Sequence, residues 1–189
     1  MNYAIGLLRE SKVLSHNSRD KMPDPKRLNL SIVPVEQIPK GEDVPLDDLL
    51  NIFKHGVYMQ HLCVNLDGIG LSAVQVGVPW NFFVVNDPKE GGFYLNCSYE
   101  GFGEKEKESI EGCLSLRDKH GKLRRFCLKR FERIKLKGKK LIVQKTDPQF
   151  ILEDIDREVC GLFSIVFQHE IDHANETLIS DLGAEVHIW

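Results

Sequence analysis

The sequence lacks three features that would assign it to a specialised class of protein. Its 189 residues contain no run of about 18 apolar residues, and residues 1–11 show no secretion-signal pattern. The 25 basic and 28 acidic side chains leave a formal net charge of only -3. We therefore expect neither a membrane protein nor a chain whose overall charge attracts nucleic acid.

Cysteine is scarce, with five residues and no Cys-x-x-Cys pair. An odd number without such spacing argues against a disulfide framework. This favours a reducing compartment, and we assign the chain to the cytoplasm. Its length and its 42% hydrophobic content suit one globular domain over residues 1–189, in which residues 1–40 carry few structural signals.

The expected fold class is α+β. Apolar residues at helical spacing predict a first helix over residues 46–66. Short runs rich in aromatic and β-branched residues predict strands at 30–35, 81–85, 92–97, 125–128, 130–136 and 141–145. Lys137-Gly138-Lys139 is interpreted as a hairpin turn, and the basic run around it, Lys119–Lys140, as the polar face of strands.

A last helix is predicted near the C-terminus. Acids at Glu153–Asp156 mark its expected start, and Val159 and Cys160 are placed on it. It is expected to end near Asn175. We predict small antiparallel or mixed β-sheets packed around this helix, with the helix at 46–66 as one further N-terminal helix.

The predicted last helix carries the segment Gln168-His169-Glu170-Ile171-Asp172-His173. His169 and His173 are four positions apart, so they share one helix face and can reach one metal ion, with Glu170 placed to handle a proton. Asp172 either orients a ligand histidine from behind or is a solvated carboxylate. A catalytic site of this type needs a third protein ligand and one open position.

Three segments together resemble the signature motifs of the peptide deformylases. They are Gly68-Ile-Gly-Leu-Ser-Ala-Val-Gln75, Glu111-Gly-Cys-Leu-Ser115 and Gln168-His-Glu-Ile-Asp-His173, and the resemblance covers about residues 40–182. It implies that Cys113 is the third metal ligand beside His169 and His173. It further implies that Glu170 is the general base and acid, and that the Gln75 side chain and the Leu114 backbone N–H stabilise an oxyanion.

The resemblance also implies a function. The chain is expected to be a metal-dependent hydrolase that removes the formyl group from the N-terminal formyl-methionine of newly made polypeptides. The implied cofactor is one divalent ion, natively Fe²⁺, with Zn²⁺, Ni²⁺ or Co²⁺ able to replace it. An extended substrate is expected to pair with Ile69-Gly70. The other expected substrate contacts are Leu162, Ile165, Val166 and Arg125. Core packing explains the first three of these positions equally well.

Two departures from the family pattern stand out. Leu116-Arg117-Asp118 and a longer basic loop over residues 117–125 replace the usual proline after Cys-Leu-Ser, so preference beyond formyl-methionine is left open. The chain also ends sixteen residues after His173, too soon for the C-terminal helix with which many relatives dock on ribosomes. The expected protein is a monomer whose partners are N-formylated nascent peptides, with no nucleic acid and no membrane.

Two alternative functions remain open from the sequence. An HExxH zinc endopeptidase would take its third ligand downstream of the last helix, where only His187 is available. A catalytically silent binder of formyl-peptides with the same fold would have no need of a base at Glu170. The identity of the third ligand separates the first alternative from a deformylase.

Overall fold

The computed structural model describes residues 46–78, 80–102, 106–143 and 150–187. The strand predicted at 30–35 and the N-terminal segment 1–40 lie outside these residues. The described part is mainly β-sheet with few helices, as the sequence predicts. Its elements, in chain order, are α2 (Leu46–Asn65), β1 (Gly70–Ser72), the 3₁₀-helix η2 (Ala73–Val76), β2 (Phe82–Val85), β3 (Gly92–Gly101), β4 (Glu106–Arg117), β5 (Leu123–Phe131), β6 (Arg133–Val143), β7 (Phe150–Cys160), α3 (Leu162–Ala174), α4 (Ile179–Leu182) and β8 (Ala184–Val186).

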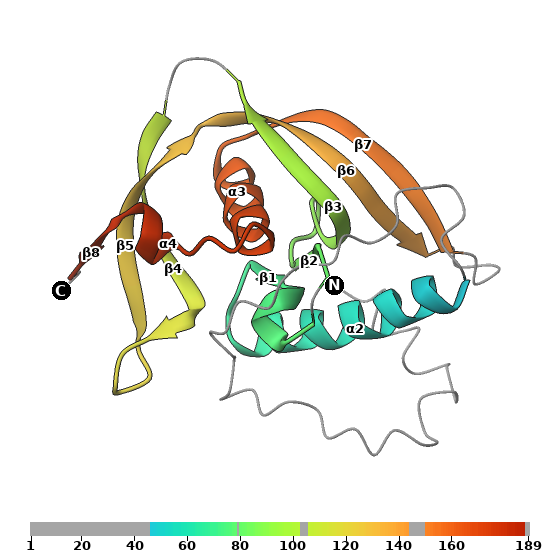
Figure 1. Cartoon of the computed structure of the whole chain (residues 1–189), viewed down its shortest axis with the longest axis horizontal. Coiled ribbons are helices and arrows are strands. Elements are labelled where there is room, and N and C mark those ends of the chain that lie inside the picture. The colour runs from blue at the N-terminus through green and yellow to red at the C-terminus, as the bar shows by residue number, and fades with distance from the viewer. Residues whose placement is uncertain (1–45, 79, 103–105, 144–149, 188–189) are drawn as a thin grey trace.

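Two antiparallel sheets form the frame of the molecule. The larger has the strand order β1-β2-β3-β6-β7, and the smaller has the order β4-β5-β8. In Figure 1, α3 lies between the long strands of the larger sheet and the β4-β5 pair, while α2 runs beneath β1 and β2. Helix α3 contacts strands of both sheets, so it is the element on which the two sheets converge.

Both faces of the larger sheet are covered, which explains why β2 is apolar throughout. Phe82 and Val84 belong to a core cluster with residues of α2, whereas Phe83 and Val85 belong to a second cluster with residues of α3. Successive side chains of a strand point to opposite faces, so four consecutive apolar residues are needed between two helices. None of the helices in the described residues is long and apolar enough to cross a membrane.

The start of the last helix was predicted wrongly. Acidic residues 153–156, Val159 and Cys160 lie in β7, and α3 begins only at Leu162, after Gly161 with a φ of 66°. Asp154 and Asp156, and Glu158 further along the strand, pair with cations on β6: Lys139 with Asp154, Lys135 with Asp156 and Arg133 with Glu158. Cross-strand pairing therefore outweighs the helix-start signal of the same acids.

The predicted hairpin turn at residues 137–139 is also wrong. Strand β6 continues without interruption from Arg133 to Val143, and Gly138 pairs with Ile155 of β7. A side chain at Gly138 would lie 2.5 Å from the Cys97 sulfur on β3. This glycine therefore serves a close approach between neighbouring strands, where the sequence suggested a turn.

The basic run Lys119–Lys140 is mostly the exposed strand face that the sequence predicts, with one exception. Lys135, Lys137 and Lys139 form exposed ion pairs with carboxylates of β7 and β3. Arg130, in contrast, is only 3% exposed. It follows Phe126 and Leu128 on the inner face of β5, so its side chain points toward α3 and away from solvent.

Candidate metal centre

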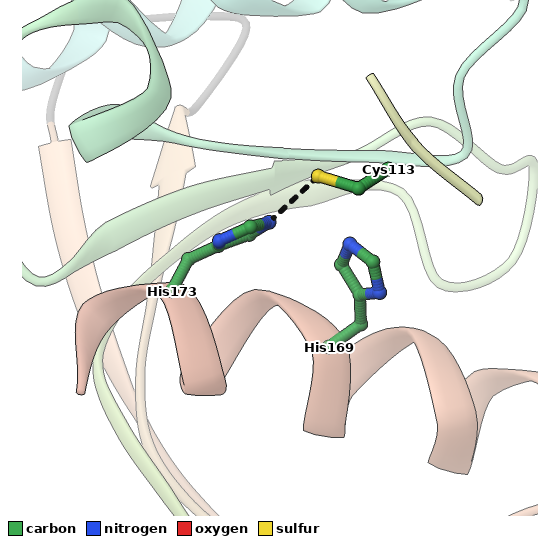
Figure 2. A group of neighbouring side chains, drawn as sticks. All are labelled: Cys113, His169 and His173. Carbon is green, nitrogen blue, oxygen red and sulfur yellow. Dashed lines mark hydrogen bonds between the residues drawn. The ribbon is translucent and has the colours of Figure 1, made fainter. Parts of the chain in front are cut away.

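Three potential ligands meet between α3 and β4. The sulfur of Cys113 lies 3.3 Å from Nε2 of His173, and one donor atom from each of Cys113, His169 and His173 lies within 4.8 Å of the others. Figure 2 shows both rings projecting from one side of the helix toward the cysteine. The i, i+4 spacing on α3 places the two imidazoles side by side, with ring centroids 4.9 Å apart.

Cys113 reaches this position because β4 leaves its partner strand there. The β4-β5 register is continuous up to Gly112, which pairs with Arg125, and resumes only at Arg117. The backbone of Leu114 lies in this interruption, beside the cysteine. Its N–H is therefore outside the regular β4-β5 ladder and close to the candidate ligands.

The donor set fits a divalent metal ion. Tetrahedral ligands at about 2.0–2.3 Å from a metal lie roughly 3.3–3.8 Å apart, and the Cys113–His173 separation falls in this range. Hydrogen bonds of the His169 ring with Cys113 and Glu111 outweigh the effect of burial and raise the pKa of His169 to about 10. Metal binding would therefore release a proton from His169, because histidine ligates a metal in its neutral form.

Glu170 follows His169 on α3 and is buried at the same place. Burial raises the pKa of its carboxyl to about 7, against the opposing influence of His169. Its Oε2 atom has no hydrogen-bond partner among the described residues. The backbone of β1 lies directly against it, since a side chain at Gly70 would clash with the Glu170 carboxylate. A buried carboxyl with a spare oxygen and a raised pKa suits proton transfer.

Gln75 is oriented so that its amide nitrogen faces the cysteine. Its Oε1 accepts a hydrogen bond from the Ser72 backbone at 2.8 Å, which fixes the amide. The opposite end donates from Nε2 to Ser115 Oγ at 2.9 Å and lies 3.4 Å from Cys113 Sγ. The short η2 helix thereby presents a fixed N–H donor at the candidate metal centre.

A buried network of ion pairs contacts the Nδ1 side of the His169 ring. The Nδ1 atom of His169 lies 2.9 Å from Glu111 Oε2. Arg130 donates to both oxygens of Glu111, at 2.8 and 3.0 Å, and its Nη1 donates to Asp172. Hydrogen bonds from His169 and Arg130 outweigh the burial of Glu111 and lower its pKa to about 2. A carboxylate on Nδ1 leaves Nε2 of His169 for a metal.

Asp172 does not contact a ligand histidine with its side chain in the described residues. It is buried, so it is not a solvated carboxylate, yet its partners are Arg130 and Tyr99. Within the described residues it is connected to His169 through Arg130 and Glu111. Helix α3 is also anchored to the end of β5, because Gln168 both donates to and accepts from the backbone of Phe131.

The residues expected to contact substrate fall into two groups. Ile69 and Leu162 are exposed, at 41% and 56%, and Arg125 is also exposed. Val166 is buried in the cluster of apolar side chains between α3 and the larger sheet, so core packing accounts for it, and Ile165 is half-buried. The guanidinium of Arg125 lies over Gly112, since a side chain there would meet Arg125 Nη1 at 3.1 Å.

Two further observations bear on alternative sites. His187 is exposed just after β8 and is not part of the Cys113, His169 and His173 group. A cavity of about 380 Å³ lies beside Ile171 and Asn175, on the face of α3 away from the two histidines. It is lined by asparagines, Ser98 and Tyr99 and contains none of the candidate ligands.

Sequence reasoning assigned no role to Glu111, Arg130, Tyr99 or Ser115. A signal existed for Arg130, which continues the alternation of Phe126 and Leu128 and so falls on the inner face of a strand. Glu111 lies within a recognised motif. No sequence pattern connects Tyr99 with Asp172, because they are 73 positions apart.

The fold and this site define a mainly antiparallel β protein with a buried cysteine and two histidines arranged for a metal. The model of the polypeptide deformylase family matches residues 21–186, and the chain belongs to this family. The peptide deformylase of Rhizobium meliloti is 30% identical over 165 residues, which cover 85% of this chain and 80% of the relative.

Solved structures agree with the family assignment. The peptide deformylase of Thermotoga maritima is 28% identical, with a TM-score of 0.56 over 85% of this chain and 92% of that chain. The deformylase of the Vibrio parahaemolyticus bacteriophage VP16T, in complex with actinonin, is 27% identical, with a TM-score of 0.55 over 84% of this chain and 96% of that chain.

Proposed function

We propose that this chain removes the N-formyl group from the N-terminal formyl-methionine of newly made polypeptides. The observation that carries the proposal is the meeting of Cys113, His169 and His173, with Glu170 beside them, in a chain of the polypeptide deformylase family. The three ligands would hold one divalent ion. When bound, such an ion supplies Lewis acidity that makes hydroxide available near neutral pH.

Residues of the protein carry out the proton transfer and stabilise the negative charge that develops. Glu170 takes the proton of the attacking water and delivers it to the leaving amine, a role that its raised pKa and free oxygen support. The Gln75 amide and the Leu114 N–H donate to the oxygen that gains charge at the formyl carbon. Loss of one such donor typically lowers kcat by about 10²–10³. We expect a loss of this size for Gln75→Leu.

A thiolate with two imidazoles binds several divalent ions, and the general affinity order favours nickel, copper and zinc over iron. We propose Fe²⁺ as the native ion, with Zn²⁺, Ni²⁺ or Co²⁺ able to replace it. Metal analysis of anaerobically purified protein tests the proposal that Fe²⁺ is the native ion. Oxygen is excluded during purification because it would oxidise Fe²⁺.

Substrate binding is proposed at the exposed edge of β1. Ile69 and Gly70 would pair with an extended peptide, in the manner of an added strand. Ile69, Leu162 and Ile165 would contact the methionine side chain, with Val166 behind them, and Arg125 would lie near the peptide path. In this proposal the chain is a single catalytic domain that acts as a cytoplasmic monomer on nascent chains.

Hydrolysis of formyl-Met-Ala-Ser tests the proposed reaction. The wild-type protein, loaded anaerobically with iron, should turn over this peptide, and Glu170→Gln should lose nearly all of the rate while retaining metal. Turnover no higher than that of Glu170→Gln would instead favour a silent formyl-peptide binder.

The third ligand separates the proposal from an HExxH endopeptidase. Cys113→Ala should lose metal, whereas His187→Ala should keep it, because His187 is not part of the ligand group. Retained metal and casein cleavage in Cys113→Ala would contradict the proposal and favour the endopeptidase.

A further inference from the structure

The buried ion-pair network has an outer end at Tyr99 of β3. The Tyr99 hydroxyl donates to Oδ1 of Asp172 at 3.3 Å, while Arg130 donates to the other carboxylate oxygen. Arg130 also holds Glu111, which accepts from His169. A side chain on the larger sheet is thus connected, contact by contact, to a candidate metal ligand.

A β-bulge in β3 creates this contact. Leu95 pairs with Lys139 and Ser98 with Lys137, so β3 advances three residues while β6 advances two. One residue is therefore extra on β3. Asn96, inside the bulge, has a φ of 49°, in the left-handed region that asparagine tolerates better than most residues.

The bulge decides which face Tyr99 occupies. Before it, Tyr94 lies in the core cluster on the α3 side of the sheet, and Leu95 lies in the cluster on the α2 side. Tyr99 is five residues after Tyr94, so regular alternation would place it on the α2 side. The extra residue returns Cys97 and Tyr99 to the α3 side, where Asp172 lies.

Neighbouring residues are adapted to this bulge. Gly138 on β6 faces it, and a side chain there would meet Cys97 Sγ at 2.5 Å and Cys97 Cα at 2.9 Å. A glycine is therefore required opposite the bulge. Asn96, Cys97 and Gly138 together permit a backbone irregularity whose result is to aim Tyr99 at Asp172.

We propose that Tyr99 is a positioning residue for the metal centre: its hydroxyl fixes Asp172 and, through Arg130 and Glu111, holds His169 in its metal-binding orientation. The inference rests on the metal site of the proposed function. Without the hydroxyl, the Asp172 carboxylate keeps its contact with Arg130 as its one side-chain partner among the described residues, and it can rotate. The Arg130 guanidinium binds both Asp172 and Glu111. Rotation of Asp172 therefore also loosens the positions of Glu111 and of the His169 ring.

Metal affinity in Tyr99→Phe tests the proposal. Loss of a group that directly supports a metal ligand typically weakens binding 10–100-fold; because Tyr99 acts through intermediaries, we expect about 3–10-fold. Tyr94→Phe is the matched control. Tyr94 lies on the same strand and in the same core cluster, but its hydroxyl donates to the Glu90 carbonyl at 2.6 Å. Zn²⁺ affinity is measured by competition with a chromophoric chelator, and the Co²⁺-loaded protein is compared by visible absorption.

The expected result is weaker Zn²⁺ binding and an altered Co²⁺ spectrum in Tyr99→Phe, with both unchanged in Tyr94→Phe. Equal affinities in the two variants would overturn the proposal. The effect should also disappear in an Asp172→Ala background, because the Tyr99 hydroxyl then has no acceptor oxygen at position 172. A full effect of Tyr99→Phe in that background would show that the hydroxyl acts by another route.

Failure of the metal site itself gives a different result. A wild-type protein that binds no stoichiometric Zn²⁺ or Co²⁺ would overturn the proposed function. Normal wild-type binding with an unaffected Tyr99→Phe would overturn only the role of Tyr99.

Discussion

Two sets of ion pairs in this molecule have similar lengths and opposite surroundings. Between β4, β5 and α3, Arg130 is bound by Glu111 and Asp172, with side chains exposed by 3%, 7% and 11%. Across β6 and β7, Lys135 pairs with Asp156 at 3.0 Å, with side chains 40% and 59% exposed. The N···O distances do not distinguish the two sets of ion pairs, whereas the exposed fractions of their side chains do.

The difference lies in what happens when one partner is removed. An exposed partner is simply hydrated, so surface pairs contribute about 0–1 kcal/mol. A buried partner stays desolvated without its counter-charge, so breaking such a pair costs about 3–5 kcal/mol. The exposed pairs explain how β7 recognises β6, whereas the buried pairs explain how His169 is held. Each of the following variants tests one side of this comparison.

The largest effect is expected for Arg130→Met. This change leaves Glu111 and Asp172 buried without a cation, so the free energy of unfolding should fall by about 3–5 kcal/mol. Arg133→Met is the control, because its contact with Glu158 at 3.8 Å is more than half exposed on both sides. Urea unfolding monitored by circular dichroism measures both variants. A similar loss in the two would show that burial does not govern these pairs.

A smaller effect, on metal binding more than on stability, is expected for Glu111→Gln. The amide oxygen can still accept from His169 Nδ1, but the negative charge that supports the ring is lost. Zn²⁺ affinity should fall about 10–100-fold. Glu185→Gln removes the exposed carboxylate that binds Arg124 and should leave the affinity unchanged. Chelator competition compares the two, and an unaffected Glu111→Gln would remove this carboxylate from the metal-binding apparatus.

A contrast between local and distant contacts also explains which parts of the fold and the site could be predicted from the sequence. The pairing of His169 with His173 follows from helix geometry, and the resemblance to a family adds Cys113, which the structure brings to the same place. Local signals suffice there because each motif is a short contiguous segment. Helix α2 is likewise observed where apolar periodicity predicts it, within a residue of the expected end.

Predictions failed where partners from distant segments decide the outcome. The acids of β7 resemble a helix start until their partners on β6 are known. Gly138 resembles a turn residue in the sequence, whereas in the structure it lies against Cys97 of the neighbouring strand β3. Arg130 belongs to a basic run by composition, yet its burial depends on Glu111 and Asp172, which lie 19 and 42 positions away.

The smallest effect is expected for the exposed pair of Lys135 and Asp156, at 3.0 Å with side chains 40% and 59% exposed. A double-mutant cycle with Lys135→Met and Asp156→Asn should give a coupling below about 1 kcal/mol. Salt sharpens the contrast with the buried network. At 1 M salt the screening length is about 3 Å, so the coupling should vanish, whereas the penalty of Arg130→Met should persist because ions do not reach it. If the salt dependence of the two were the same, β7 would be held to β6 by the same kind of desolvated contact that holds His169.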